Sequence, residues 1–375
     1  MGYENPPGYD ERGGHVRVSR WVLAAGVAAL AAAIAVGTAL GGRSTPRART
    51  VSAKQVAIVT DIGGLNDKGF NHLAYVGFKQ AQTKLGIKGR VFITNTSDER
   101  LANLESAAKD GYGLVIGVGF NFFQDFGQVD PSFPNTHFAG VDIDHGSICA
   151  SGNTCAGQSN YHGIIFREQE AGYLVGYIAG LMIHLHPYKH KQIVSAVGAN
   201  PVPAIVHYLA GFRAGARKAN KHVKVFLSMA NDPTFNDQTK CKVTTQNQIS
   251  RGSGIVFEAA GGCGLGGLSA AKQAHIWGIG VDANQGFLGP FMLTSALKKV
   301  DTGVYDIIKQ FKNNPSSIKG NADTTFTVKN HGVGYAPLSK KVSKKDRAFI
   351  TKKVNAIAKM IAKGKIKVPT TYPGA

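Results

Sequence analysis

Polar and aromatic side chains concentrate in residues 60–71, which read TDIGGLNDKGFN. This run follows the short apolar segment 56–59, so we expect it at the carboxyl end of a strand. Asn66 and Asp67 suit a helix cap, and turn and cap chemistry would account for several of the polar residues. Phe70 is an aromatic residue at the start of the next helix, near Asp61 at the strand end. This combination indicates the wall of a binding pocket.

Glycines dominate residues 259–267, AAGGCGLGG. The segment lacks the Lys-Ser/Thr pair of a phosphate-binding loop, and its spacing differs from the dinucleotide fingerprint. We interpret it as a place where the backbone, Gly261 included, approaches a ligand or a neighbouring helix. Glycines also repeat every four residues at Gly172, Gly176 and Gly180, where we expect a helix to lie close to a sheet.

Other clusters do not support catalysis or metal binding. His184, His186 and His190 stand at a predicted helix end without a nearby cysteine or carboxylate, which favours a basic solvated turn. Glu168 and Glu170 are two apart on a predicted helix, so they should point to different sides and have surface roles. No GxSxG elbow or Cys/His/Asn pattern is present to supply a nucleophile. The sequence therefore predicts no enzyme, no cofactor and no metal site.

Strand and helix patterns alternate from residue 54 onward. The first series has predicted strands at 56–59, 90–94, 114–117 and 138–141, and the second has strands at 192–197, 223–227, 254–258 and 277–281. The helices between the strands include 98–109, 167–185, 203–220, 237–251 and 268–275. This alternation predicts parallel sheets with helices on both faces, arranged as two doubly wound lobes. Ligands of such sheets bind at the carboxyl ends of the strands.

After residue 293 the pattern continues with a strand, a helix at 301–312 and a strand near 325–328. A final helix over 343–362 places Ile350, Val354, Ile357 and Ile361 on one stripe, with lysines opposite. We expect this helix to dock on a lobe; the alternative is that it lies on a membrane surface.

The chain has 375 residues and a net charge of +20, and its length suffices for two domains. Half of the charge lies in residues 338–375, which contain eleven Lys/Arg and one acid. A basic excess can indicate nucleic acid, an anionic membrane or an anionic envelope. Because no arginine-rich or aromatic-interleaved motif is present, we expect no nucleic-acid partner and favour a solvated tail or an envelope contact.

An uncharged, alanine-rich run covers residues 21–42 and follows Arg12, Arg17 and Arg20. About 20 apolar residues span a bilayer, and positive charge before the run places later residues outside. The arginines after the run weaken that rule. We expect export, with the run either retained as a membrane anchor or cleaved as a signal. The first cysteine is Cys149, so lipidation at an N-terminal cysteine is excluded.

An exported chain meets oxidising conditions, so the four cysteines are disulfide candidates. Cys149 and Cys155 share a loop rich in Gly, Ser and Asn, and Cys241 and Cys263 are both predicted at the cleft edge of the second lobe. We expect these two pairings as hypotheses, since spacing alone does not prove connectivity.

Several motifs together resemble the basic membrane protein family of ABC-importer solute-binding proteins, which includes purine nucleoside receptors. They appear in the family's order between residues 54 and 337. They are VAIVTDIGGLNDKGFN (56–71), DGYGLVIGVGF (110–120), FREQEAGYLVGYIAGLM (166–182), FEAAGGCG (257–264), GVD (280–282), LTSALKKVD (293–301) and GVGYAP (332–337). The chain departs from the family in having Asn66 where an acid is usual, no lipobox cysteine and a long basic tail.

The resemblance implies a type I periplasmic-binding-protein fold, an α/β fold of two doubly wound parallel-sheet lobes joined by a three-segment hinge. The expected first lobe comprises residues 54–165 with 296–320, and the second comprises 166–295 with 321–337. Residues 1–53 form the polar segment and signal or anchor helix, and residues 338–375 form the basic helix and tail.

The resemblance also implies a nucleoside in the cleft, its base stacked between Phe70 and Phe235. Asp61 and Asp142 correspond to acids that face the base or sugar, and Asp282 and Lys298 to ribose contacts. Asn71 and Gly261 complete the expected ligand set.

The implied function is capture of a nucleoside, with a purine favoured, and its delivery to the permease of an ABC importer. The protein would act at the outer face of the cytoplasmic membrane or in the cell envelope. Two alternatives remain: a binding or sensor protein for another small solute, and an envelope-binding protein that uses the basic tail.

Overall fold

The computed structural model describes residues 52–150, 160–186 and 191–374. The chain divides into two units, residues 1–47 and residues 48–375, and all the described residues belong to the second. The predicted signal or anchor run 21–42, His190 and the Cys149–Cys155 pairing lie outside the described residues or side chains. Among the helices of the described part, none is both long and apolar enough to cross a membrane.

Two sheets organise the unit 48–375. In the described residues the first sheet has the strand order β11-β5-β4-β3-β1-β2, and all its pairings are parallel. Its strands are β1 (Ser52–Thr60), β2 (Lys88–Ile93), β3 (Tyr112–Val118), β4 (His137–Val141), β5 (Tyr161–Phe166) and β11 (Ala322–Phe326). The central strands are apolar on both faces, as in a sheet covered by helices on both sides.

The second sheet has the order β12-β10-β9-β8-β6-β7 in the described residues. Its strands are β6 (Ile193–Gly198), β7 (Lys224–Met229), β8 (Ile255–Ala259), β9 (Trp277–Asp282), β10 (Met292–Lys298) and β12 (Val333–Tyr335). All pairings are parallel except that of the short edge strand β12, which runs antiparallel to β10.

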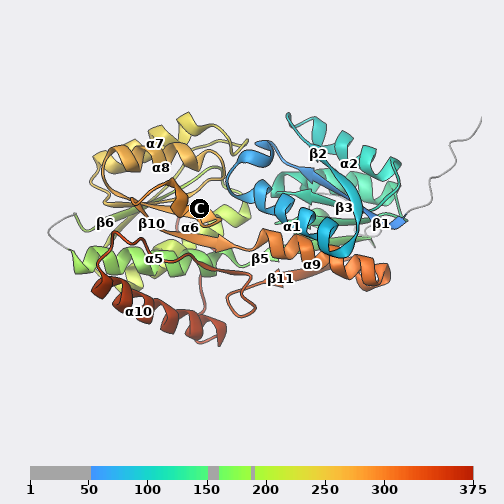
Figure 1. Ribbon diagram of the computed structural model, residues 1–375. Helices are drawn as coiled ribbons and strands as arrows, with labels where there is room; N and C mark the ends of the chain where they lie inside the picture. The colour runs from blue at the N-terminus through green and yellow to red at the C-terminus, as the bar shows by residue number, and fades with distance from the viewer. Residues whose placement is uncertain (1–51, 151–159, 187–190, 375) are drawn as a thin grey trace, which may run out of the picture. The chain divides into compact units, whose positions relative to one another are not determined.

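Helices cover both faces of each sheet (Figure 1). In the first lobe α1 packs on α9, and α2 packs on α3; in the second lobe α5 packs on α6, and α7 on α8. The helices are α1 (Phe70–Leu85), α2 (Glu99–Lys109), α3 (Phe123–Val129), α4 (His145–Ala150), α5 (Glu168–Leu185), α6 (Pro203–Ala219), α7 (Gln238–Ser250), α8 (Gly264–Gln273), α9 (Val300–Asn313) and α10 (Lys344–Ala362). The predicted class of two doubly wound lobes is confirmed.

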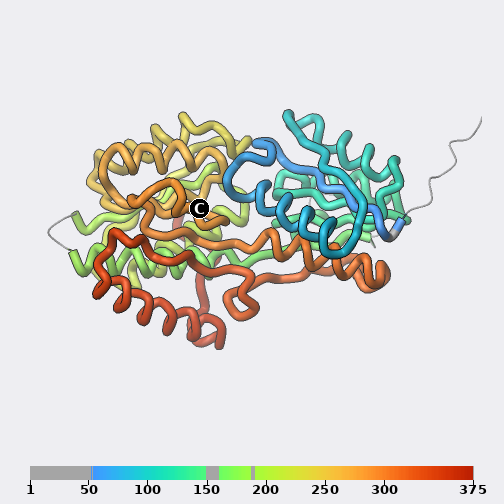
Figure 2. The backbone as a smooth tube through the Cα atoms, viewed as in Figure 1, coloured from blue at the N-terminus to red at the C-terminus, as the bar shows by residue number. Residues whose placement is uncertain are grey.

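Within the described residues the chain passes between the lobes three times: from β5 to α5, from β10 to α9 and from β11 to β12 (Figure 2). Two predicted boundaries are wrong. Residues 296–298 were expected in the first lobe, but they are the end of β10 in the second sheet. Residues 321–337 were expected in the second lobe, but β11 pairs with β5 in the first sheet, and only β12 joins the second. The sequence of β11, ADTTF, is short and largely polar, so its local pattern does not reveal which sheet it extends.

The regular glycines of α5 bring it close to a helix, where a sheet was expected. A Cβ on Gly172 would lie 2.3 Å from the carbonyl oxygen of Tyr208 on α6, and one on Gly176 would lie 2.1 Å from that of Phe212. Because real Cβ atoms do not approach backbone oxygens so closely, these positions require glycine for the two helices to pack.

The final helix docks on a lobe, as expected. Its apolar stripe, Ile350, Val354, Ile357 and Ile361, is buried, and α10 packs against α5 on the outside of the second lobe (Figure 1).

Candidate functional site

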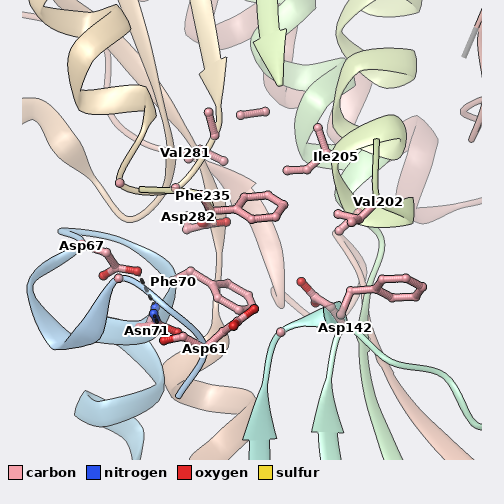
Figure 3. A pocket seen from close by; sticks show the side chains of 18 of the residues that line it. Asp61, Asp67, Phe70, Asn71, Asp142, Val202, Ile205, Phe235, Val281 and Asp282 are labelled. Atoms are coloured by element: carbon pink, nitrogen blue, oxygen red, sulfur yellow. Dashed lines mark hydrogen bonds between the residues drawn. The ribbon is translucent and has the colours of Figure 1, made fainter. Parts of the chain in front are cut away.

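A pocket lies between the two lobes, at the carboxyl ends of strands from both sheets. It encloses about 720 Å³ of space, its open mouth included. The residues predicted to bind ligand all line it: Asp61, Phe70, Asn71, Asp142, Phe235, Gly261, Asp282 and Lys298. Figure 3 labels Asp61, Phe70, Asn71, Asp142, Phe235 and Asp282 among them.

The loop between β1 and α1 is held by Asp67. Its carboxylate accepts hydrogen bonds from the backbone N–H groups of Gly69, Asn71 and His72, at 3.1, 2.7 and 3.0 Å. Burial raises the pKa of Asp67, although these three N–H groups favour its charged form. This cap of the first turn fixes the backbone of Phe70, which lines the pocket. The cap interpretation is therefore confirmed for Asp67. Asn66 makes no such cap and ends a 3₁₀ turn.

Asp61 is held by protein groups at the pocket floor. Its Oδ1 accepts from Arg100 Nε at 2.7 Å and from the backbone N–H of Ile62 at 2.8 Å, and its Oδ2 accepts from Asn121 Nδ2 at 2.8 Å. Asn121 also donates to the carbonyl of Pro233 in the other lobe at 3.4 Å. Sequence reasoning missed Arg100 and Asn121, because their contact with Asp61 spans 39 and 60 residues.

Two aromatic rings enter the pocket from opposite lobes (Figure 3). Phe70 belongs to the start of α1, and Phe235 lies in the loop between β7 and α7 with a φ of 57°. The Phe235 carbonyl accepts from the backbone N–H of Cys263 at 2.9 Å. A Cβ on Gly261 would lie 3.3 Å from the same carbonyl oxygen, so the glycine-rich segment packs directly under the Phe235 loop.

A disulfide joins Cys241 to Cys263, with 5.5 Å between the Cα atoms. This is the second of the two pairings named from the sequence. It links the first turn of α7 to the glycine-rich segment, and Phe235 packs against the buried cluster that contains both cysteines. The bridge therefore braces the backbone that presents Phe235.

Lys298, at the end of β10, is the centre of a buried ion cluster. Its Nζ lies 2.5 Å from Asp142 Oδ2 and 2.9 Å from Glu168 Oε1, and the residue is 1 % exposed. The ammonium also lies 5.0 Å from the centre of the Phe70 ring. Asp282 completes the group and accepts from the Tyr208 hydroxyl at 3.1 Å.

The charges of this cluster shift one another's titration. Burial raises the pKa of Asp142 to about 7 and that of Asp282 to about 6, because the charged carboxylates lose hydration. Burial opposes the charge of Lys298, but the neighbouring Asp142, Glu168 and Asp282 outweigh it and raise the lysine pKa. Burial also opposes ionisation of Glu168, yet Lys298 and His207 together lower its pKa.

Asp142 retains an unused acceptor. Its Oδ1 is buried and has no hydrogen-bond partner among the described residues, while Oδ2 binds Lys298. Both Asp142 and Asp282 have left-handed backbones, with φ of 68° and 59°. Non-glycine residues held in this region cost about 1–3 kcal/mol each and cluster at binding sites. The arrangement suits a ligand that donates a hydrogen bond to Asp142.

The expectation of surface roles for Glu168 and Glu170 is wrong, since both residues are buried. Glu168 binds Lys298 and lies 3.3 Å from His207 Nδ1, and Glu170 Oε2 accepts from the backbone N–H of Val328 at 2.7 Å. Helix α5 starts at a crossing between lobes and is buried on nearly all sides. Glu168 and Glu170 therefore both point into the protein, although they leave the helix in different directions. The absence of Asp, Glu, Lys and Arg from the rest of this helix is the sequence signal that could have revealed its burial.

The histidine cluster shows no metal geometry in the part of the chain that is described. His186 Nε2 lies 3.3 Å from Asp346 Oδ2, and no group of three or more metal-ligating side chains is found among the described residues.

Two doubly wound lobes around an interlobe pocket define the class of periplasmic-type solute-binding proteins. The family profile described as ABC transporter substrate-binding protein, PnrA-like, matches residues 54–371, and the chain belongs to this family. Its members are binding proteins, not enzymes, in agreement with the sequence analysis.

Known relatives span most of the chain. The ABC transporter nucleoside-binding protein BmpA of Lactococcus lactis is 28% identical over 334 residues, covering 82% of this chain and 90% of the relative. An uncharacterized lipoprotein of Pyrococcus horikoshii is 29% identical over 316 residues, covering 81% and 74%. Among solved structures, a solute-binding protein of an ABC transporter system from Aeropyrum pernix superposes with a TM-score of 0.72 at 22% identity, covering 84% and 93%. The last supports the fold alone.

Proposed function

We propose that this substrate-binding protein captures a nucleoside, with a purine base preferred, and delivers it to an ABC importer permease. The observation that carries the proposal is the pair of aromatic rings, Phe70 and Phe235, that enter one pocket from opposite lobes. A flat base between them would contact both lobes at once. Ligand binding would thereby favour the closed arrangement that a permease can distinguish from an empty one.

The polar groups around the rings supply selectivity in this proposal. Stacking tolerates any base, so discrimination falls to groups such as the free Oδ1 of Asp142 and the amide of Asn71. In this proposal Asp282 and Lys298 bind the sugar hydroxyls. A site built to bind a hydroxyl rejects analogues that lack it, because its own polar groups then stay unpaired. A free base should therefore bind more weakly than its nucleoside.

The relatives support the ligand class and the location. The Lactococcus relative is named a nucleoside-binding protein, and the Pyrococcus relative is named a lipoprotein. This chain has no cysteine before Cys149. We therefore propose that residues 21–42, and not a lipid anchor, direct it to the outer face of the membrane.

Calorimetric titration of the purified protein with adenosine, guanosine and inosine tests the proposal. Removal of a stacking ring costs about 1–3 kcal/mol per base, so Phe70→Ala or Phe235→Ala should weaken binding roughly 5- to 150-fold. Phe78→Ala is the matched control, because Phe78 lies on the same helix but in the core at 1 % exposure. It should lower stability by about 3–5 kcal/mol and leave the affinity of the folded protein near that of wild type.

Two results would overturn the proposal: wild type that binds none of the three nucleosides, or both cleft variants binding as wild type does. A thermal-shift screen with sugars, amino acids and nucleosides then identifies the alternative solute.

A further inference from the structure

Helix α10 presents a second, separate surface on the outside of the second lobe. Its inner stripe is buried against the lobe, so the opposite side faces solvent. We define the outer face of α10 as seven exposed residues of the helix and its C-terminal end, five lysines and two large apolar side chains. They are Lys345, Phe349, Lys352, Lys353, Lys359, Met360 and Lys363.

Two large apolar side chains lie among these lysines. Phe349 is 41 % exposed and Met360 is 40 % exposed. They are eleven residues apart, which on an α-helix places them within about 20° of each other and roughly 16 Å apart along the axis. On the same geometry the five lysines project between about 20° and 100° from these two side chains, so the apolar pair lies on a flank that adjoins the basic side of the helix.

The positive charge of the outer face is not neutralised within the described residues. No ion pair joins a carboxylate to its lysines there; Lys353 lies 5.6 Å over the Phe349 ring. The single acid of the helix, Asp346, accepts from Ser343 Oγ at 2.7 Å and lies 3.3 Å from His186. The surface therefore has an unmatched basic charge that calls for an anionic partner.

We propose that the outer face of α10 docks the protein on a membrane surface rich in anionic lipid headgroups. Clusters of four to eight basic residues on a helix bind such surfaces, each contributing about fivefold to the binding constant. The exposed Phe349 and Met360 favour lipid over a soluble polyanion, because a polyanion offers no apolar layer. Docking requires no rearrangement, since the inner stripe stays in the lobe.

Retention of residues 21–42 as an anchor, the first of the two outcomes expected from the sequence, would hold the domain at a membrane. Residues 21–42 form an uncharged run long enough to span a bilayer. The proposal is independent of the ligand in the cleft and would stand if that ligand were not a nucleoside.

Lysine footprinting on the full chain tests the docking. The protein is reconstituted in nanodiscs of phosphatidylcholine alone, or with about one third phosphatidylglycerol, and lysines are acetylated and quantified by mass spectrometry. In anionic discs Lys352, Lys353 and Lys359 should react at least about fivefold more slowly, as expected for even one lysine's electrostatic contribution. Lys88 and Lys272, exposed on other elements, should react equally in both discs. Salt at 1 M should remove the protection.

Two variants separate charge from apolar contact. Lys352→Gln/Lys353→Gln/Lys359→Gln should lower docking about 100-fold and expose Lys345 and Lys363 to the reagent. Phe349→Ala/Met360→Ala should weaken the protection while leaving its salt dependence intact.

Equal reaction rates in the two lipids, or equal slowing of Lys88 and Lys272, would overturn the proposal. Protection in phosphatidylcholine discs by added polyphosphate, without any effect of phosphatidylglycerol, would assign the face to a soluble or wall-bound polyanion and would also refute it.

Discussion

Replacement of Lys298 by methionine should destabilise the protein in a pH-dependent way. The substitution keeps the length of the side chain and removes the ammonium that binds Asp142 and Glu168. Removal of one partner from a buried ion pair costs about 3–5 kcal/mol, because the other charge is left uncompensated. With an unfolding entropy near 2.1 cal/mol/K per residue over roughly 320 residues, this corresponds to a fall in Tm of about 4–7 °C.

The sign of the pH dependence follows from the carboxyl groups. Burial raises the pKa of Asp142 to about 7, so the folded state keeps a proton that the unfolded chain has lost. This group therefore favours folding at low pH, and its contribution weakens as pH rises from about 4 to about 7. In the variant, Asp142 and Glu168 both lose the lysine that lowers their pKa, so each pKa rises. The penalty should be largest at pH 8 and shrink toward pH 5, as the carboxyls take up protons.

Scanning calorimetry of wild type and variant at pH 5, 6, 7 and 8 measures this penalty. Lys299→Met is the control, because the neighbouring Lys299 is exposed. It should change Tm by little at any pH. Adding Asp142→Asn to Lys298→Met should recover part of the loss at pH 8, since it removes one uncompensated charge. A penalty that stays constant from pH 5 to pH 8, or an equal effect of Lys299→Met, would refute the reasoning.

Two further predictions concern the packing of the second lobe. Cys241→Ser/Cys263→Ser opens a loop closed across 22 residues, so it should lower the free energy of unfolding, measured with urea, by about 3 kcal/mol. Ligand binding should also weaken, because the loop that carries Phe235 loses its covalent support. Unchanged affinity would show that this loop is held without the disulfide. Gly215→Ala places a Cβ 2.0 Å from the Tyr173 carbonyl oxygen, so it should lower the free energy of unfolding by about 1–3 kcal/mol. The control Gly334→Ala places its Cβ in open space and should lower it less. Equal losses of stability would contradict the close packing of α5 on α6.

The alternating strand and helix patterns predicted the two lobes because each element carries its own local pattern. The membership of β11 was not predictable in this way, since ADTTF would fit the edge of either sheet. The glycine repeat of α5 indicated a close approach but not its partner, because a sheet and a helix impose the same need for a missing side chain. A local sequence pattern therefore predicts a helix or strand and its buried face, but not which other element packs against that face.

The pocket lining was predictable because binding residues follow strand ends, and because several motifs resembled one family. The ion cluster was only half predicted. Lys298 and Asp142 were both named, but their direct contact spans 156 residues. Glu168 was missed because one face of its helix was expected to meet solvent, and α5 has almost no such face.

The three passages of the chain between lobes constrain how this protein could be divided or recombined. Each lobe is assembled from separate stretches of sequence, so no single cut in the gene releases an intact lobe. A chimaera that exchanged one lobe with a relative would need junctions at all three crossings, after β5, after β10 and between β11 and β12. Lys298, beside the second junction, belongs to the second lobe and binds Asp142 of the first, so a change of specificity by domain exchange would have to preserve this ion pair across the graft.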